Sequence, residues 1–518
     1  MRLEAFGVKN LRCLTDTGLV PIRPITVLVG RNSSGKSTFL RAFPLLRQSV
    51  ETARNSPILW YHERFVDFGS LKDAAAQRLA EPEATFQFRL RLPKVAELAI
   101  DDPVFDISMT LAGSEVPHVG AYEIHAEGHD IRWDLDATGR LRSVTANGKA
   151  IKIEGALSLG GKAYLLPTLQ YGEGLSLSYH QTPETLNPSS FEWQTNADAI
   201  LANPVTKLLS PLFDDNALEH MAGNAPYELL FGNRSAMLRQ LGTISGPKHF
   251  RQRVGKLDVN GSEFEQIASA TVAFLSPYII EAADFALAQL MSHVAYLKPL
   301  RVSPERAYRI QNLSVDEVDP DGKNLPMFLR SLSPAELASF ATFTQKTLGF
   351  ETTVRTTGIH AEILVKEGQK RGFVNLVDVG FGYSEVLPLA AVLWSTCLRP
   401  AMQGRAPTPL VAIEQPELHL HPAAQAKLAR ALAEAVAGSE SRIIVETHSE
   451  SLINGLGKLI YDGVLKAEDV QIALFDKDDE TGETEVHLAG YREDGALHDW
   501  PYGFLSPVAE RRVPSAAE

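Results

Sequence analysis

The stretch Gly30-Arg31-Asn32-Ser33-Ser34-Gly35-Lys36-Ser37 is a complete phosphate-binding loop of the G-x-x-x-x-G-K-[ST] pattern. In such a loop the backbone N–H groups close round phosphate oxygens, Lys36 reaches the β- and γ-phosphates, and the Ser37 hydroxyl binds Mg²⁺. An apolar run at residues 25–29 leads into the loop, and a helix-like run at residues 38–43 follows it. This order places the positive end of a helix dipole on the phosphates. We therefore predict nucleotide binding, with these contact residues: Gly30, Asn32, Ser33, Ser34, Gly35, Lys36, Ser37 and Thr38.

The whole chain has the composition of a globular protein, with 518 residues, 44% of them hydrophobic, and a formal net charge of −13. Its length favours two or three structural units. Cys13 and Cys397 lie far apart and form no disulfide framework or metal-binding spacing, which fits a reducing cytoplasm. No signal-peptide pattern opens the sequence, and no run approaches the ~18 apolar residues that a membrane helix needs. We expect a cytoplasmic protein with no membrane partner, whose charge excludes a chain-wide nucleic-acid surface but leaves a local basic groove open.

The sequence divides into three parts by pattern. Residues 1–95 form an N-terminal lobe with strand-like runs around the phosphate loop. Residues 96–290 form an insertion that is β-rich at first, with a turn signal at Asn147-Gly148, and helical afterwards. Residues 291–518 alternate short apolar strands with helices, which indicates a parallel sheet covered on both faces. No stretch keeps a heptad repeat over several turns, so we expect no long coiled-coil arm.

Segments that can complete the nucleotide site follow apolar strands much later in the chain. Hydrolysis needs an acidic group for the metal and a group that orients the attacking water. Glu414-Gln415-Pro416-Glu417 follows one apolar run, and Glu446-Thr447-His448-Ser449 follows the next. Ligands of open α/β sheets bind beyond such strand ends. Between the loop and these strands, Gly380-Phe381-Gly382-Tyr383-Ser384 precedes a helix and can form an anion-binding turn.

The order of these segments resembles the ABC-type ATPases of the RecF, OLD and SMC-like group. It looks closest to compact bacterial members that end in a Trp-Pro-x-Gly-Phe motif, here Trp500-Pro501-Tyr502-Gly503-Phe504, and carry a Pro-Leu-Arg segment, here Pro299-Leu300-Arg301. The resemblance covers residues 1–95 and 291–505. It implies an α/β fold in which residues 1–95 and 291–518 form an ABC-type P-loop ATPase head, a mixed sheet flanked by helices. Residues 96–290 would then be a large β-then-α insertion.

The resemblance also implies a role for each matching residue. ATP and Mg²⁺ are the implied ligands, held by Lys36 on the phosphates and by Ser37 on the metal. Glu414 occupies the Walker B position and would hold Mg²⁺ through water. His448 would be the switch histidine beside the γ-phosphate.

The glycine-rich turn at residues 380–384 is the part of the resemblance that implies an oligomeric state. Gly380, Gly382 and Ser384 match the signature turn of the family, which contacts the γ-phosphate of the nucleotide bound to the opposite subunit. The implied mechanism is therefore a homodimer with ATP sandwiched between its subunits.

Two positions depart from the family pattern. Gln415 stands where the catalytic glutamate is usual, and its amide can orient water but cannot accept a proton. Hydrolysis is then slow, or Glu417 contributes. Glu385 stands where the signature commonly has glutamine, which adds negative charge near the phosphates unless the side chain points away.

Two acidic or histidine clusters allow a second interpretation. His419 and His421 could suggest a metal pair, but no third ligand stands at a recognised spacing. Their match to the D-loop region of the resembled family is the favoured interpretation. Residues 476–479, Asp-Lys-Asp-Asp, could combine with Glu446 as in a TOPRIM nuclease. A hairpin turn at this place is favoured because little chain remains for a further α/β domain.

Basic residues allow two interpretations as well. Lys248, Arg251, Arg253 and Lys256 form either a solvated face, which we favour, or a contact to a nucleic-acid backbone. Arg301 and Arg306 either reach phosphates or pair with acids in the dimer interface, and the sequence does not separate the two.

The function that this combination predicts is an ATPase that dimerises on Mg-ATP and controls a separate effector protein. Compact members of the resembled family often belong to bacterial anti-phage systems. One alternative is a RecF-like ATPase of DNA repair or recombination with bound nucleic acid. Another is a slowly hydrolysing, nucleotide-dependent scaffold, because Gln415 replaces the proton acceptor.

Overall fold

The structure is a computed structural model. It describes the following residues: 1–92, 102–172, 177–180, 198–213, 223–311, 315–368, 372–399 and 409–500.

The chain forms two compact units, and each is made of two separate segments. The first unit consists of Met1–Pro21 and Arg41–Val294, and the second of Ile22–Leu40 and Ala295–Glu518. The phosphate loop therefore belongs to the second unit together with the C-terminal part of the sequence. The division into parts at residues 95 and 290 stays a prediction.

The first unit is built on an antiparallel sheet with the strand order β10-β9-β8-β7-β6-β5-β1-β2. Buried and half-buried side chains alternate along its strands, as in β6, so one face is apolar and the other polar. Asn147 and Gly148 both have positive φ and join β9 to β10 in the two-residue turn that the sequence predicts. The strands are β1 (Arg2–Leu11), β2 (Leu14–Asp16), β3 (Val20–Pro21), β5 (Glu83–Arg91), β6 (Val104–Ala112), β7 (His118–Ala126), β8 (His129–Leu135), β9 (Leu141–Ala146) and β10 (Lys149–Ala150).

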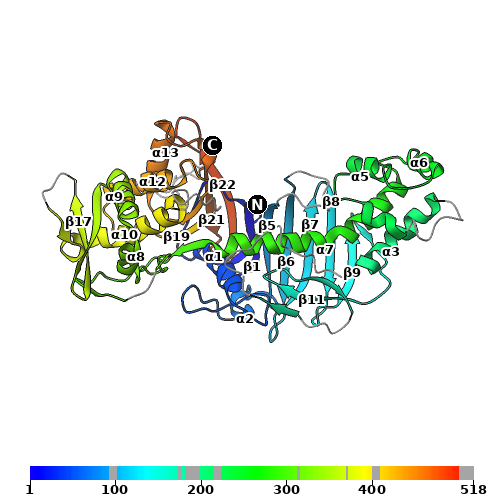
Figure 1. Cartoon of the computed structure of the whole chain (residues 1–518), viewed down its shortest axis with the longest axis horizontal. Coiled ribbons are helices and arrows are strands. Elements are labelled where there is room, and N and C mark those ends of the chain that lie inside the picture. The colour runs from blue at the N-terminus through cyan, green and yellow to red at the C-terminus, as the bar shows by residue number, and fades with distance from the viewer. Residues whose placement is uncertain are drawn as a thin grey trace, which may run out of the picture. The chain divides into compact units, whose positions relative to one another are not determined.

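A single long helix, α7 (Ser262–Ser292), covers the apolar face of this sheet (Figure 1). Trp133 of β8 donates from Nε1 to Ser276 Oγ of α7 at 3.0 Å. By length and composition α7 could cross a membrane, since an 18-residue window has a mean hydropathy of 1.3. The expectation that no run of the sequence approaches the length of a membrane helix was therefore wrong. Within the structure 94% of that window is buried, as is usual for a core helix.

Smaller elements complete the first unit. A three-stranded sheet contains β11 (Leu157–Ala163), β12 (Thr168–Tyr171) and β13 (Leu177–Tyr179). The short helices are α2 (Leu71–Ala74), α3 (Asp198–Leu209), η2 (Ser210–Leu212), η3 (Ala225–Glu228), α5 (Arg234–Leu241) and α6 (Lys248–Val254). Strands thus precede helices in this part of the chain, as predicted.

Asp284 of α7 connects the helix to the segment at residues 164–166 of the same chain. Its carboxylate accepts hydrogen bonds from the backbone N–H groups of Tyr164, Leu165 and Leu166 at 2.6–2.8 Å. Burial raises the pKa of Asp284 from 3.8 to about 6, and the three donors oppose this shift. Folding therefore favours the protonated carboxyl group.

This shift predicts a pH dependence of stability. Because the folded pKa lies above the unfolded value, the contribution is fully present below about pH 4 and is lost as the pH rises through about 6. We expect the melting temperature of the wild type to fall between pH 4 and pH 7 by more than that of Asp284→Asn. The control Asp102→Asn changes an exposed carboxylate of the same unit. Parallel curves for wild type and Asp284→Asn would contradict the assignment.

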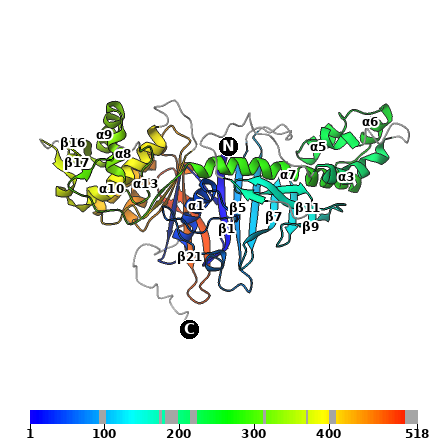
Figure 2. The ribbon, with the colours of Figure 1, turned by 60° about the horizontal axis from the view of Figure 1, so that its bottom comes forward.

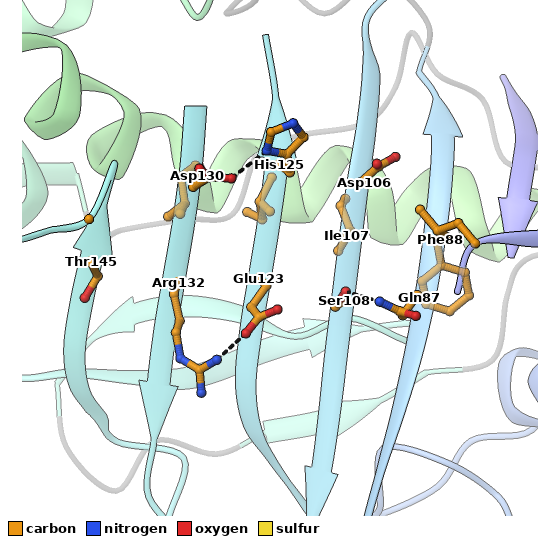
Figure 3. A pocket seen from close by; sticks show the side chains of 14 residues that line it. Gln87, Phe88, Asp106, Ile107, Ser108, Glu123, His125, Asp130, Arg132 and Thr145 are labelled. Carbon is orange, nitrogen blue, oxygen red and sulfur yellow. Dashed lines mark hydrogen bonds and ion pairs between the residues drawn. The ribbon is translucent and has the colours of Figure 1, made fainter. Parts of the chain in front are cut away.

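The polar face of the first sheet carries a shallow hollow of about 380 Å³ (Figure 3). Its charged side chains pair across neighbouring strands, Arg132 with Glu123 and His125 with Asp130. Figure 3 shows these pairs on the side of the strands that faces away from α7. The hollow contains none of the predicted site residues.

The second unit is built on a mixed sheet with the strand order β22-β21-β4-β20-β19-β14. β21, β4, β20 and β19 are parallel, and β22 joins β21 as an antiparallel hairpin. β20 therefore lies between the strand that leads into the phosphate loop, β4, and the acidic strand, β19. The strands are β4 (Ile25–Gly30), β14 (Val294–Leu297), β19 (Leu410–Glu414), β20 (Arg442–Glu446), β21 (Val470–Lys477), β22 (Thr484–Tyr491) and β23 (Leu497–His498).

Helices pack on these strands, and a second small sheet packs against some of the helices. Figure 2 shows the same elements from another side. The helices of the unit are α8 (Leu325–Ser331), α9 (Pro334–Leu348), η4 (Leu376–Asp378), α10 (Gly380–Leu393), η5 (Trp394–Leu398), α12 (Pro422–Val436), α13 (Glu450–Tyr461) and η6 (Ala467–Asp469), while α1 (Lys36–Glu51) begins in it. The small sheet contains β15 (Tyr308–Arg309), β16 (Phe350–Thr357), β17 (His360–Glu367) and β18 (Val374–Asn375). This mixed sheet flanked by helices confirms the predicted fold class.

Candidate nucleotide-binding site

The phosphate loop is shaped by two glycines and by one serine with a left-handed backbone conformation. β4 ends at Gly30 and α1 begins at Lys36, so the loop joins a buried strand to a helix N-terminus as predicted. A Cβ on Gly30 would lie 2.5 Å from the Phe475 carbonyl oxygen, which is too close for any atom pair. Gly35 has φ of 92° and Ser33 has φ of 61°, which turn the backbone back on itself. The loop therefore presents its N–H groups at the end of the sheet.

Lys36 is held at the mouth of this loop. Its side chain is buried, with 3% exposure, and Nζ donates to the carbonyl oxygens of Gly30 at 3.0 Å and Arg31 at 2.7 Å. A phosphate would offer the same ammonium group a charged acceptor, which makes a stronger hydrogen bond than a neutral carbonyl. The position fits the predicted phosphate contact.

Two glutamates end neighbouring strands beside the loop. Glu414 of β19 and Glu446 of β20 are opposite each other in the parallel register, and both are buried. The Ser37 hydroxyl donates to Glu446 Oε1 at 2.9 Å, although the two residues are 409 positions apart. Glu414 Oε1 instead accepts a hydrogen bond from the Tyr296 hydroxyl at 2.6 Å. The predicted site residues omit Glu446 and Tyr296, and only the strand-end position of Glu446 pointed to it.

Gln415 and Glu417 occupy the loop that follows β19. Gln415 has φ of 39°, its N–H donates to the Glu446 carbonyl oxygen at 2.9 Å, and its Nε2 lies 3.5 Å from Glu446 Oε1. Glu417 Oε1 accepts from the His448 backbone N–H at 2.6 Å. Burial raises the pKa of Glu417, and this hydrogen bond partly offsets the effect. In this structure Glu417 therefore orients the segment that contains His448.

His448 lies close enough to Lys36 of the phosphate loop for the charge of that lysine to affect its pKa. Burial and the positive charge of Lys36 lower the pKa of His448. The next residue, Ser449, is the N-cap of α13, and its side chain accepts from the Leu452 N–H at 3.0 Å. The lowered pKa favours the neutral imidazole, which can donate or accept a hydrogen bond.

The signature turn lies at the start of α10, where Gly380 has φ of 34°. Ser384 is buried, and a Cβ on Gly382 would contact Leu420, in the loop after β19, at 3.6 Å. The contacts of Glu385 run to Arg301 at 3.3 Å and to His419 at 3.4 Å. The contacts with Leu420 and His419 join the turn at the start of α10 to the loop after β19.

The structure shows the surroundings of the basic residues for which the sequence left two interpretations. Arg301 pairs with Glu385 and Arg306 pairs with Asp378, so both arginines pair with acids of the same chain. Burial lowers the pKa of Arg301, and the charge of Glu385 opposes this shift. The four basic residues at 248–256 are exposed on α6 and just beyond it, which agrees with a solvated face.

The two histidines and the acidic cluster have separate roles. His419 contacts Glu385, whereas His421 Nδ1 caps α12 by accepting from the Ala423 N–H at 3.2 Å. Asp478 Oδ1 accepts from two backbone N–H groups in the turn between β21 and β22, which confirms the predicted hairpin. Trp500 packs against the core of the second unit, and the rest of its motif, residues 501–504, lies outside the described residues.

Comparisons with known families match the two parts of the sequence that hold the site. The model described as "AAA ATPase domain" matches residues 1–85, which contain the phosphate loop. The model described as "AAA domain, putative AbiEii toxin, Type IV TA system" matches residues 271–454, which contain the signature turn, both acidic strands and His448. Fold and site thus define a P-loop ATPase-type protein. Both matches are to ATPase domains, which confirms the resemblance to the ABC-type ATPase group.

Individual relatives are similar over different extents. An OLD nuclease of Thermus scotoductus is 48% identical over 48 residues, which are 9% of this chain and 9% of that protein. The SMC head bound to the C-terminal winged-helix domain of ScpA aligns over 95% of this chain and 98% of its own, with 13% identity and a TM-score of 0.39. The SMC head of Thermotoga maritima aligns over 94% and 98%, with 9% identity and a TM-score of 0.34.

Proposed function

We propose that this protein is a cytoplasmic Mg²⁺-dependent ATPase that dimerises around Mg-ATP and controls a separate effector protein in bacterial anti-phage defence. The observation that carries the ATPase part is the contact between Ser37 and Glu446. It joins the phosphate loop to the acidic strand ends and to Gln415. The match to a family model whose description names a toxin system supports a defence role.

The residues fit a nucleotide with Mg²⁺. The Ser37 hydroxyl and the carboxylates of Glu414 and Glu446 are hard oxygen donors, the kind that Mg²⁺ prefers. Bound there, Mg²⁺ would neutralise charge that develops on the phosphates. Lys36 and the loop N–H groups would hold the β- and γ-phosphates in place.

The attacking water would be oriented rather than deprotonated. The Gln415 amide can accept one hydrogen bond from water but takes no proton, and Glu417 Oε1 is engaged by the His448 N–H. A positioned general base typically contributes 10²–10⁴-fold to a rate. We therefore propose slow turnover, with neutral His448 donating a hydrogen bond to the γ-phosphate.

Turnover and its response to DNA test these assignments. Phosphate release from Mg-ATP by the purified protein supports an ATPase, and its complete absence would favour a nucleotide-dependent scaffold. Stimulation by duplex DNA, falling steeply with salt, would favour the RecF-like alternative. Turnover indifferent to DNA supports a protein effector, which co-purification from the native host would identify.

The dimer gives a separate prediction. Mg-ATP should raise the solution mass from monomer to dimer, and Ser384→Arg should prevent the rise because a cationic side chain fills the signature turn. Mass photometry or light scattering measures this change. Ala338→Arg, on the exposed side of α9, adds the same charge to the same unit and should leave the rise intact. A monomer mass for the wild type in every nucleotide state would refute the sandwich, and an unchanged melting temperature verifies that Ser384→Arg is folded.

A further inference from the structure

Glu446 occupies a special place in the strand order of the second unit. It ends β20, which lies between β4 and β19, and it is opposite Leu28 on one side and Glu414 on the other. Its side chain is 1% exposed. A buried carboxylate is costly unless charge or hydrogen bonds compensate it. The position therefore calls for a functional or structural reason.

The contacts of Glu446 point toward the metal-binding side of the phosphate loop. Its Oε1 accepts the Ser37 hydroxyl at 2.9 Å, and Ser37 is the loop residue whose oxygen binds Mg²⁺. The same Oε1 lies 3.5 Å from Nε2 of Gln415, the residue placed to orient water. One carboxylate oxygen thus touches both the metal-binding hydroxyl and the water-orienting amide.

Glu414 is held from its other side. The hydroxyl of Tyr296, a buried residue of β14, donates to Glu414 Oε1 at 2.6 Å. This short bond occupies one oxygen of the Walker B carboxylate and limits its rotation. Glu414 is thereby fixed one strand further than Glu446 from the strand that enters the loop.

We infer that Glu446 is a metal-binding carboxylate of this site, sharing Mg²⁺ with Ser37, and that Tyr296 positions Glu414. The inference rests on the proposed nucleotide site and adds a ligand to it. Mg²⁺ keeps several waters and takes one or two carboxylates, so Glu446 and Glu414 can both belong to its surroundings, one of them through water. If Glu446 were only a structural acceptor for Ser37, a glutamine would serve equally well, since its amide oxygen accepts the same bond.

Glu446→Gln separates these two roles, and Mn²⁺ is the probe. Electron paramagnetic resonance should show wild type with a non-hydrolysable ATP analogue binding Mn²⁺ at least ~10-fold more tightly than Glu446→Gln, the loss typical when a metal site is perturbed. Binding of the analogue without metal should persist in the variant. Glu450→Gln, an exposed change four residues further on, should match the wild type. Equal Mn²⁺ affinity in wild type and Glu446→Gln would overturn the inference.

Two further measurements keep the outcome clear. Glu446→Asp retains the charge on a shorter side chain, so its Mn²⁺ affinity should lie between those of wild type and Glu446→Gln, and it replaces the latter if that variant does not fold. Failure of the wild type to bind the analogue at all would overturn the proposed function itself. Normal binding of the analogue with unchanged Mn²⁺ affinity in both variants would overturn the role of Glu446 alone.

Discussion

Lys36→Ala should abolish ATP hydrolysis and weaken ATP binding by about 100-fold or more. Lys36 is the buried cation at the mouth of the loop, held by the carbonyl oxygens of Gly30 and Arg31. A hydrogen bond to a charged group contributes about 1.5–3 kcal/mol, and an ammonium group between two phosphates makes more than one such bond. Fluorescent-nucleotide titration and phosphate release measure the two effects.

The control for this variant is Lys458→Ala, which removes an exposed lysine of the same unit that pairs with Asp462. It should bind and hydrolyse ATP as the wild type does. If Lys36→Ala retained wild-type affinity, the loop at residues 30–37 would not be the nucleotide site, and the proposals for Ser37 and Glu446 would fail with it.

Arg301→Met should cost about 3–5 kcal/mol of stability, the range measured when one partner of a buried ion pair is removed. The Arg301 side chain is 1% exposed and pairs with Glu385, which is 12% exposed. Without the guanidinium group, the Glu385 carboxylate stays largely buried, and its remaining ion-pair contact among the described residues is with His419. Urea unfolding, followed by a probe in the second unit, measures the loss.

A second substitution identifies the cause of this loss. Arg301→Met combined with Glu385→Gln should recover much of the stability, because the buried charge disappears together with its partner. Arg306→Met is a matched control, since Arg306 and Asp378 form an exposed pair whose loss should cost about 1 kcal/mol or less. Additive costs of the Arg301 and Glu385 changes would show that the pair is not coupled.

The Arg301–Glu385 pair also explains how the negative charge of Glu385 is accommodated near the expected phosphates. A glutamate in the signature adds negative charge where phosphates are expected. In the structure this charge is directed to Arg301 and His419, on the side of the loop after β19. The charge of Glu385 is thus compensated within the chain, and Ser384 remains the signature residue proposed to meet a nucleotide.

The parts of the site that could be predicted are those that a short segment encodes. The phosphate loop requires glycine at Gly35, where φ is 92°, and a lysine and a serine at the helix N-terminus. Alternation and turn residues likewise predicted the strands of the first unit, including the turn at Asn147-Gly148. Each of these features depends on neighbours within a few residues.

The partners of the acidic residues could not be predicted in this way. Glu414 and Glu446 have the same local pattern, an acid at the end of a buried strand, so the sequence ranks them only by family resemblance. Their order in the sheet decides which of them meets Ser37, and strand order depends on the packing of segments hundreds of residues apart. Tyr296 illustrates this, because it reaches Glu414 from a strand 118 residues earlier.

The sequence by itself therefore determined that this protein has a phosphate-loop pattern, two acidic strand ends and a glycine-rich turn before a helix, because local sterics and hydrogen-bonding chemistry specify such elements. Only the tertiary structure decided that β20 lies between β4 and β19, that Ser37 meets Glu446, and that Arg301 compensates Glu385. These pairings arise from long-range packing of the parallel sheet, whose strands carry no local signal for their neighbours.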